Sequence, residues 1–444
     1  MKNNKILKNT FVDFTQMYEF SKNPLIFSKA NGINLWDINN KTYIDAIGGI
    51  FVTILGHNYK PINQIICEQL SKISFSPPLH GISDVGLKFI DDFSKITPKN
   101  LNFIKAFSGG SEANESAIKF SRQYHKQSKN PGKYKTLSLY ESYHGGSLAT
   151  SSASGVGKRK VKFEPLMSGF IKVPSPYQIY KRTKNWREAN ELSIMIIEDI
   201  IINEDPDTIS SFLLEPICNT AGIVEPSNHF FKEIRKLCTK YNIILILDEI
   251  LCGIAKTGKM FAFEYHDIIP DIICAGKSLS NGAIPIGVMA VNNNISDYFW
   301  GPDSENINFA HGHTFAGNPL ASVVCSKVID EISNKNLLQK ANDNGLYLRS
   351  KLDKLLKYDF IIEIRGRGSL LGVEISNEYF IKKYKNFKNF GYYFKQTSIK
   401  NGLILRVDPN WFAISPPLIA NKSQLDEIIS LIDNSINDVF KLIK

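Results

Sequence analysis

The sequence predicts an α/β protein with a mostly parallel sheet covered by helices on both faces, followed by a small α+β domain. Two observations carry this prediction. Short apolar runs alternate with helical periods between about residues 61 and 333, and the pattern changes to closely spaced strands after residue 334. With 444 residues, 43% of them hydrophobic, the chain is long enough to bury a large core and to form two or three closely associated domains.

The N-terminal segment, residues 1–60, is predicted to contribute to the small domain. From Gly32 to Gly56, apolar and polar residues alternate, with a turn signal at Asn39-Asn40. This pattern is typical of short antiparallel strands. We expect them to pack with the strands of the C-terminal segment.

The central segment, residues 61–333, is predicted to be the large domain. Helical periods run from Glu112 to Ser128 and from Asn228 to Tyr241. Strands are expected at residues 103–107, 136–139, 210–214, 243–247 and 285–290. In such parallel sheets, ligands bind at the carboxyl ends of the strands.

The last segment, residues 334–444, is predicted to be the small domain. A long helix to about Tyr358 opens it, and a helix beginning at Lys422 closes it. The expected strands between them lie around residues 361–364, 370–374, 403–406 and 412–415. A binding site between the two domains is therefore expected.

Composition argues against several classes of function. The chain has 53 Lys and Arg against 43 Asp and Glu, but the basic residues are scattered and no nucleic-acid module is recognisable. No apolar stretch approaches the ~20 residues of a membrane span, and the first ten residues are too polar for a secretory signal. The six cysteines show no C-x-x-C spacing. We expect a soluble cytoplasmic protein with reduced thiols, binding neither nucleic acid nor membrane.

Two strand ends carry an amine and a carboxylate. Lys277 follows the apolar run Ile272-Ile273-Cys274, and Asp248 follows Ile243 to Leu247. A lysine can form a Schiff base with an aldehyde, and a carboxylate can keep a ring nitrogen protonated, which together suit pyridoxal phosphate. A single lysine after an apolar run is more often simply solvated.

The run Ser108-Gly109-Gly110-Ser111 lies between an expected strand and an expected helix. Glycines permit a tight turn, and the amides of the helix N-terminus, together with the Ser111 hydroxyl, can bind a phosphate. An ordinary helix cap formed by Ser111 would give the same pattern.

Other strand ends supply further candidates. Tyr143, in Tyr143-His144-Gly145, is an aromatic side chain on which a flat ring could stack, and Glu215 is a carboxylate after Leu214. Arg406 could bind a carboxylate at two points. Taken singly, Tyr143 could equally be a tyrosine that packs in a turn, and Arg406 could equally be a surface arginine.

Two motifs suggest other ligands. His311 and His313 lack a third metal ligand nearby, so no metal site is predicted, and Thr314 beside them is the better candidate as a phosphate donor. The segment Gly253 to Met260 fits G-x-x-x-x-G-K, but Met260 stands where a P-loop needs Ser or Thr. The roles of its two lysines, Lys256 and Lys259, stay open.

In order and spacing, these motifs resemble the class III pyridoxal-phosphate-dependent aminotransferases of fold type I and look ω-transaminase-like. The resemblance runs from about Gly32 to Ile419. It rests on Ser108 to Asn114, Tyr143-His144-Gly145, Glu215-Pro216, Leu247-Asp248-Glu249, Lys277 and Thr314 to Pro319. The resemblance implies a large domain, built on a mostly parallel sheet of the seven-stranded kind covered by helices, and a small α+β domain.

The resemblance also implies roles for individual residues. Lys277 would hold the cofactor and shuttle a proton, and Asp248 would bind the pyridine nitrogen. Cofactor contacts are further implied for Gly110, Ser111, Tyr143, Glu215 and Ile250, and for Thr314 from the second subunit of a homodimer. Phe51 and Arg406 would contact substrate.

The implied activity is transfer of an amino group from an amine or ω-amino acid to a keto acid such as pyruvate, in ping-pong order. An aminomutase, a decarboxylating aminotransferase or a catalytically silent binding protein would retain much of the same pattern. The chain departs from the family at Ser278 to Gly282, at Lys256, where Arg is common, and at Ile217 to Thr220. These departures leave the substrate open.

Overall fold

The computed structural model describes residues 6–384 and 387–443, and its centre is a seven-stranded sheet. The strand order is β4-β10-β9-β8-β7-β5-β6, and within it β10 alone runs antiparallel to its neighbours. The strands are β4 (Phe103–Phe107), β5 (Lys135–Leu139), β6 (Phe170–Val173), β7 (Ile209–Leu214), β8 (Ile244–Asp248), β9 (Ile272–Gly276) and β10 (Gly287–Val291). The predicted α/β fold with a mostly parallel sheet is confirmed.

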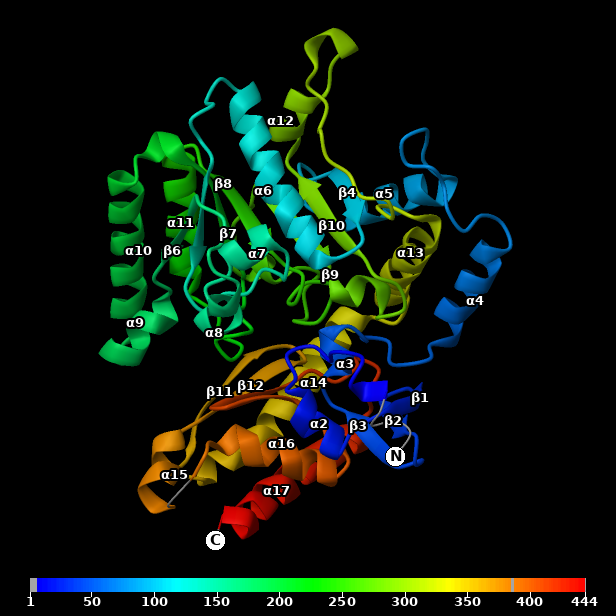
Figure 1. Ribbon diagram of the computed structural model, residues 1–444, viewed down its shortest axis with the longest axis vertical. Coiled ribbons are helices and arrows are strands. Elements are labelled where there is room, and N and C mark those ends of the chain that lie inside the picture. The colour runs from blue at the N-terminus through cyan, green and yellow to red at the C-terminus, as the bar shows by residue number, and fades with distance from the viewer. Residues whose placement is uncertain (1–5, 385–386, 444) are drawn as a thin grey trace.

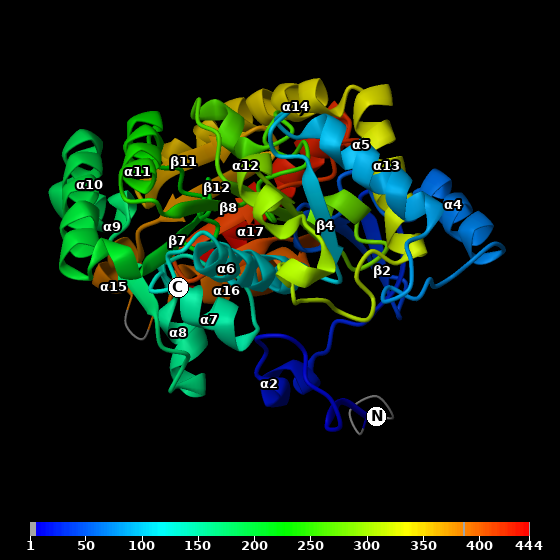
Figure 2. The same ribbon diagram turned by 90° about the horizontal axis from the view of Figure 1, so that it is seen from above.

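Helices cover both faces of this sheet (Figure 1, Figure 2). Alternate strand residues pack on one side against α6 (Gly110–Gln127) and on the other against a larger cluster. This larger cluster includes side chains of α4 (Lys60–Leu70), α5 (Asp84–Ile96), α10 (Trp186–Asn203), α11 (Asn228–Lys240) and α13 (Pro319–Asn334). Shorter helices lie at the rim: α7 (Leu148–Ala153), α8 (Gly157–Lys160), α9 (Pro176–Thr183) and α12 (Asn293–Ser296). Both sheet faces are therefore buried, as a parallel sheet requires.

Polar side chains fix where several of these helices begin. Ser83 accepts a hydrogen bond from Gly86 N at the start of α5, and Ser227 accepts one from Phe230 N at the start of α11. Asn318 does the same for Ala321 N at the start of α13, where Pro319 is the first helical residue. Such caps satisfy amides that have no partner within the helix. By contrast, α6 has a glycine, Gly109, at its cap position.

The N- and C-terminal parts of the chain form a second body below the large sheet (Figure 1). Here β1 (Phe27–Asn31), β2 (Asn34–Asp37) and β3 (Thr42–Asp45) form an antiparallel meander, and β13 (Leu403–Ile404) adds in parallel to β3. The second small sheet has the order β11 (Ile361–Arg367), β12 (Leu370–Ile375), β15 (Trp411–Ile414) and β14 (Arg406–Asp408). Around these sheets lie α2 (Met17–Lys22), α14 (Leu337–Leu352), α15 (Asn377–Lys383), α16 (Phe390–Lys400) and α17 (Lys422–Ile443). One apolar cluster joins Ile33 and Ile44 to the C-terminal helices.

The expected strand at 403–406 is in fact two strands. Leu403 pairs with Ile44 in the first small sheet, whereas Arg406 pairs with Ala413 in the second. The chain changes sheets at Leu405, because no single straight strand can satisfy both partners. Arg406 consequently begins a strand and does not end one.

Two other predictions need correction, and one strand was missed. The helix expected from residue 334 to 358 is α14, which stops at Leu352 and is followed by a 3-10 helix, Asp353–Lys357. The segment Gly48–Phe51 is a short, kinked helix and not a strand, with positive φ at Gly48 and Gly49. Strand β6 was not predicted, because Lys172 interrupts its apolar run.

All six cysteines are free, and four of them are buried. Over the described ranges, no helix combines the length and the apolar character needed to cross a membrane.

Candidate active site

The carboxyl ends of the parallel strands meet at one edge of the large sheet, where it faces the smaller body. A pocket of about 530 Å³ opens there. Nine of the ten predicted site residues line it: Phe51, Gly110, Ser111, Tyr143, Glu215, Asp248, Ile250, Lys277 and Arg406. Residues more than 350 positions apart in the sequence therefore share one cavity.

Lys277 follows the last residue of β9 directly and opens a 3-10 turn, Lys277–Ser280. Its φ of 43° is in the left-handed region, a strained conformation for a residue with a side chain. Burial lowers the pKa of its amine, while Asp248 and Glu215 act in the opposite direction. A lowered pKa increases the fraction of neutral, nucleophilic amine at neutral pH.

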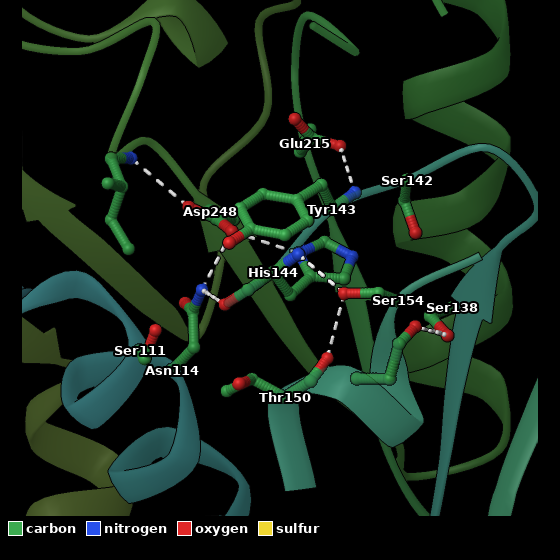
Figure 3. Close-up of polar contacts among 12 residues, drawn as sticks. Ser111, Asn114, Ser138, Ser142, Tyr143, His144, Thr150, Ser154, Glu215 and Asp248 are labelled. Carbon is green, nitrogen blue, oxygen red and sulfur yellow. Dashed lines mark hydrogen bonds and ion pairs between the residues drawn. The ribbon is translucent and has the colours of Figure 1, made fainter. Parts of the chain in front are cut away.

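Asp248 ends β8 and is 5% exposed. Its Oδ2 accepts a hydrogen bond of 2.7 Å from Asn114 Nδ2 and lies 2.9 Å from His144 Nδ1. Its Oδ1 accepts a bond of 3.2 Å from Ile250 N. Figure 3 shows Asn114 and His144 converging on this carboxylate. The carboxylate is thus fixed in orientation at the pocket wall.

Glu215 supports the loop that carries Tyr143. Its Oε2 accepts a hydrogen bond of 3.0 Å from Tyr143 N (Figure 3). Burial raises the pKa of Glu215 to about 7. Burial also raises the pKa of the Tyr143 phenol, whose ring lines the pocket. Glu215 therefore fixes the backbone that carries the Tyr143 ring.

The N-terminus of α6 provides an anion seat. The first amides of any α-helix have no partner within the helix. In this 18-residue helix Gly109 occupies the cap position, and no side chain there accepts from these amides. Gly109, Gly110 and Ser111 all line the pocket. Gly145 packs closely here: a Cβ at this position, where φ is +142°, would lie 2.5 Å from Ser111 Oγ. These features suit a phosphate group.

Phe51 is 2% exposed and has a φ of 66°. Its carbonyl oxygen accepts hydrogen bonds from Lys256 Nζ at 2.7 Å and from Ser278 Oγ at 3.3 Å. Lys256 also donates to Leu251 O at 2.6 Å. Lys256 is 1% exposed, and burial lowers its pKa to about 7. Lys256 therefore fixes the backbone beside Phe51.

The P-loop-like segment from Gly253 to Met260 does not form a phosphate loop. It passes through turns into the 3-10 helix Ala262–Tyr265, so no α-helix N-terminus follows it. Since Lys256 donates to two carbonyl groups in the interior, the segment gives no support to the nucleotide hypothesis.

Arg406 reaches the pocket from the smaller body, and its Nη2 lies 2.6 Å from Asp408 Oδ2. Thr314 is the predicted residue that does not join the others. It is exposed and lines a second cavity of about 760 Å³ with Phe75 and Leu79. Thr314 is therefore outside the pocket that Lys277 of the same chain lines.

Sequence reasoning missed several pocket features. Asn114 and His144 lie within motifs that were recognised, but nothing in those motifs shows that both contact Asp248. Asp13, Phe14, Arg159 and Asn219 also line the pocket. Arg159 lies in a basic run, Lys158-Arg159-Lys160, and no sequence pattern indicates which of its members faces inward.

An amine, a fixed carboxylate, an aromatic face and an anion seat around one cavity define a site for a flat, phosphorylated pyridine aldehyde. Comparison with known proteins agrees. Residues 17–436 match the family model described as aminotransferase class-III. The chain belongs to this family, whose members depend on pyridoxal phosphate.

Individual relatives show the extent of the similarity. The adenosylmethionine-8-amino-7-oxononanoate aminotransferase of Staphylococcus aureus is 31% identical over 434 residues, covering 96% of this chain and 95% of the relative. Gamma aminobutyrate transaminase 2 of Solanum lycopersicum is 28% identical, with 97% and 95% covered. These relatives carry different names at similar identity, so the family is fixed and the substrate is not.

Solved structures agree on the fold. The (S)-enantioselective omega-transaminase from Thermomicrobium roseum superposes with a TM-score of 0.91 at 28% identity, covering 98% of this chain and 97% of the other. The omega transaminase from Pseudomonas jessenii in complex with PMP superposes with a TM-score of 0.93 at 26% identity, covering 99% and 98%. The predicted fold type and the predicted family are therefore confirmed.

Proposed function

We propose that this aminotransferase transfers an amino group from an amine or ω-amino acid to a keto acid such as pyruvate, in ping-pong order. The observation that carries the proposal is the single pocket that contains Lys277, Asp248, the N-terminus of α6 and Arg406. When bound, pyridoxal phosphate supplies the electron sink and the temporary site for the amino group. Both substrates would use this pocket in turn.

The residues of the chain have distinct tasks in this proposal. The uncapped amides of α6 at Gly110 and Ser111 would bind the phosphate, Tyr143 and Ile250 would enclose the ring, and Asp248 would bind the ring nitrogen. Lys277 Nζ would carry the proton that moves during transfer, a task suited to an amine whose pKa burial has lowered.

Substrate contacts come from the other side of the pocket. Phe51 would bound the substrate side chain. Arg406 would bind the carboxylate of the keto acid, which would replace Asp408 as the partner of its guanidinium. An amine without a carboxylate would leave the Arg406–Asp408 pair intact.

We also propose a homodimer in which Thr314 of one subunit reaches the phosphate of the other. Exposed apolar side chains surround Thr314: Leu79 is 92% exposed, Phe315 60% and Phe75 40%. A contiguous apolar surface of this kind is typical of an interface. Sedimentation of the purified protein at about twice the chain mass would support this assembly.

We further propose a cytoplasmic location for the protein, which the free, mostly buried cysteines support.

A panel of amines tests the transfer reaction. The holoenzyme should be yellow, lose this colour when a donor is added without an acceptor, and regain it when pyruvate is added. The Lys277→Ala protein should show neither change. A wild-type protein whose colour persists with every amine would contradict the proposed transfer, and a Lys277→Ala protein with wild-type turnover would contradict the role of Lys277.

A further inference from the structure

The pocket contains a second guanidinium group besides that of Arg406. Arg159 lies on α8, which belongs to the large sheet's side of the molecule, whereas Arg406 begins β14 in the smaller body. Both line the same cavity. Two arginines in one pocket of about 530 Å³ are an unusual concentration of positive charge, and Arg406 alone accounts for one substrate carboxylate.

Two aromatic rings hold Arg159 in place. Its guanidinium carbon lies 4.8 Å from the ring centroid of Tyr143 and 4.8 Å from that of Phe14. Stacking on aromatic rings uses the faces of a guanidinium and leaves the N–H groups at its edge free to donate. Since Tyr143 also lines the expected ring site, Arg159 lies beside that site.

The two arginines differ in their charge balance. Arg406 is paired with Asp408, whereas within the described ranges no carboxylate lies within the 4 Å ion-pair distance of Arg159. Asp408 and Glu215 act on Arg159 from farther away, and Asp13 lines the same pocket. Burial, and then the positive charge of Arg406, lower the pKa of Arg159. The guanidinium nevertheless stays charged, because arginine does not lose its proton in proteins.

We propose that Arg159 binds a second carboxylate, so that one of the two substrates, the amino donor or the keto acid, carries a carboxylate at each end. This assignment rests on the proposed transfer reaction and narrows its substrate class. Arg406, which begins β14, would bind one carboxylate, and Arg159, on α8, would bind the other. Each bound carboxylate would offset the positive charge of one guanidinium and so reduce the repulsion between the two arginines.

Binding of unreactive acids tests this directly. Glutarate has two carboxylates and butyrate has one, and neither carries an amine or a keto group. Titration of the holoenzyme, followed by the change in cofactor absorption, should show glutarate binding about tenfold or more tightly than butyrate, as expected for one additional charge-assisted hydrogen-bonded contact.

The variant Arg159→Gln should lose about tenfold or more in affinity for glutarate and less than twofold for butyrate, while Arg159→Lys should retain part of the preference. Lys158→Gln is the matched control, since Lys158 is exposed on the same short helix and its loss removes the same charge. The control should bind both acids like the wild type.

Other outcomes contradict the assignment. Equal losses for the two acids would mean that Arg159 and Arg406 share one carboxylate or that the substitution disturbs the fold. Unchanged glutarate binding would mean that Arg159 does not reach the ligand. A wild type that prefers glutarate but transfers no amino group from any donor would contradict the proposed reaction and leave this anion site standing.

Discussion

The Nδ1 atom of His144 lies 2.9 Å from Oδ2 of Asp248, and Asn114 donates to the same oxygen. Asn114 also donates to the carbonyl oxygen of His144 at 2.8 Å. Three segments that are separate in the sequence, α6, the loop after β5 and the end of β8, are joined at one carboxylate. The orientation of the Asp248 carboxylate in the pocket therefore depends on Asn114 and His144.

Removing Asn114 should impair catalysis. Asn114→Ala deletes a hydrogen bond to a buried carboxylate, which is worth ~1.5–3 kcal/mol, so kcat/KM should fall about 10- to 100-fold. Steady-state kinetics with the best amine from the panel would measure the loss. Asn130→Ala, in the turn after α6, is the control and should retain full activity. Wild-type kcat/KM for Asn114→Ala would show that Asp248 is oriented without it.

The close packing at Gly145 predicts a selective loss of cofactor affinity. A methyl group there would meet Ser111 Oγ at 2.5 Å and Thr150 Oγ1 at 2.6 Å, at a φ that favours glycine. Gly145→Ala should weaken pyridoxal phosphate binding at least about fivefold. Gly146→Ala is a close control, because its Cβ would meet nothing within 4 Å. Equilibrium titration of the apoproteins decides, and equal affinities for the two variants would contradict the predicted contact.

Lys256 should act on substrate binding through Phe51. Lys256→Met removes a donor from the carbonyl groups of Phe51 and Leu251. Phe51 O keeps Ser278 Oγ as a donor, so the Leu251 carbonyl is the buried group that loses its side-chain donor, at a cost of ~1–3 kcal/mol. We expect a lower unfolding temperature and a several-fold rise in the KM of amine donors. Lys259→Met, at an exposed position in the same segment, should change neither. An unchanged KM with a lower unfolding temperature would restrict Lys256 to a structural role.

Glu215 predicts a dependence of stability on pH. Its pKa is raised from 4.5 to about 7, so between these values the folded protein holds a proton that the unfolded chain releases. Stability from this group is therefore present below about pH 4.5 and is lost as pH rises to about 7, by up to about 3 kcal/mol. Glu215→Gln should remove this loss.

Urea unfolding of the apoproteins at pH 5 and pH 7.5 measures the effect. The free energy of unfolding of Glu215→Gln should gain on that of the wild type as the pH rises. Glu427→Gln, at an exposed position on α17, should stay parallel to the wild type. Parallel curves for Glu215→Gln would mean that Glu215 is ionised across this range.

Periodicity predicted the elements of the large sheet well, because buried parallel strands are short apolar runs between turns. It failed where local pattern does not determine partners. The run from Leu403 to Arg406 looks like one strand, yet Leu403 pairs with β3, which lies far away in the sequence, whereas Arg406 pairs with the adjacent strand β15 in another sheet. Strand β6 at the sheet edge carries a lysine and so lacks an uninterrupted apolar signal.

The site shows the same division. Lys277 and Asp248 could be predicted because each follows a buried strand, and the topology brings such ends together. Arg159 could not, since its place depends on how a four-residue helix packs against Tyr143 and Phe14. The position of Lys256 behind Phe51 likewise follows from tertiary packing alone.

The central claim is that Lys277 holds the cofactor. Reduction of the holoenzyme with borohydride, followed by proteolysis and mass spectrometry, measures this most directly, because reduction makes the lysine–cofactor linkage permanent. We predict one phosphopyridoxyl adduct per chain, on the peptide containing Lys277. An adduct on Lys256 or another lysine, or no adduct on a yellow holoenzyme, would contradict the account.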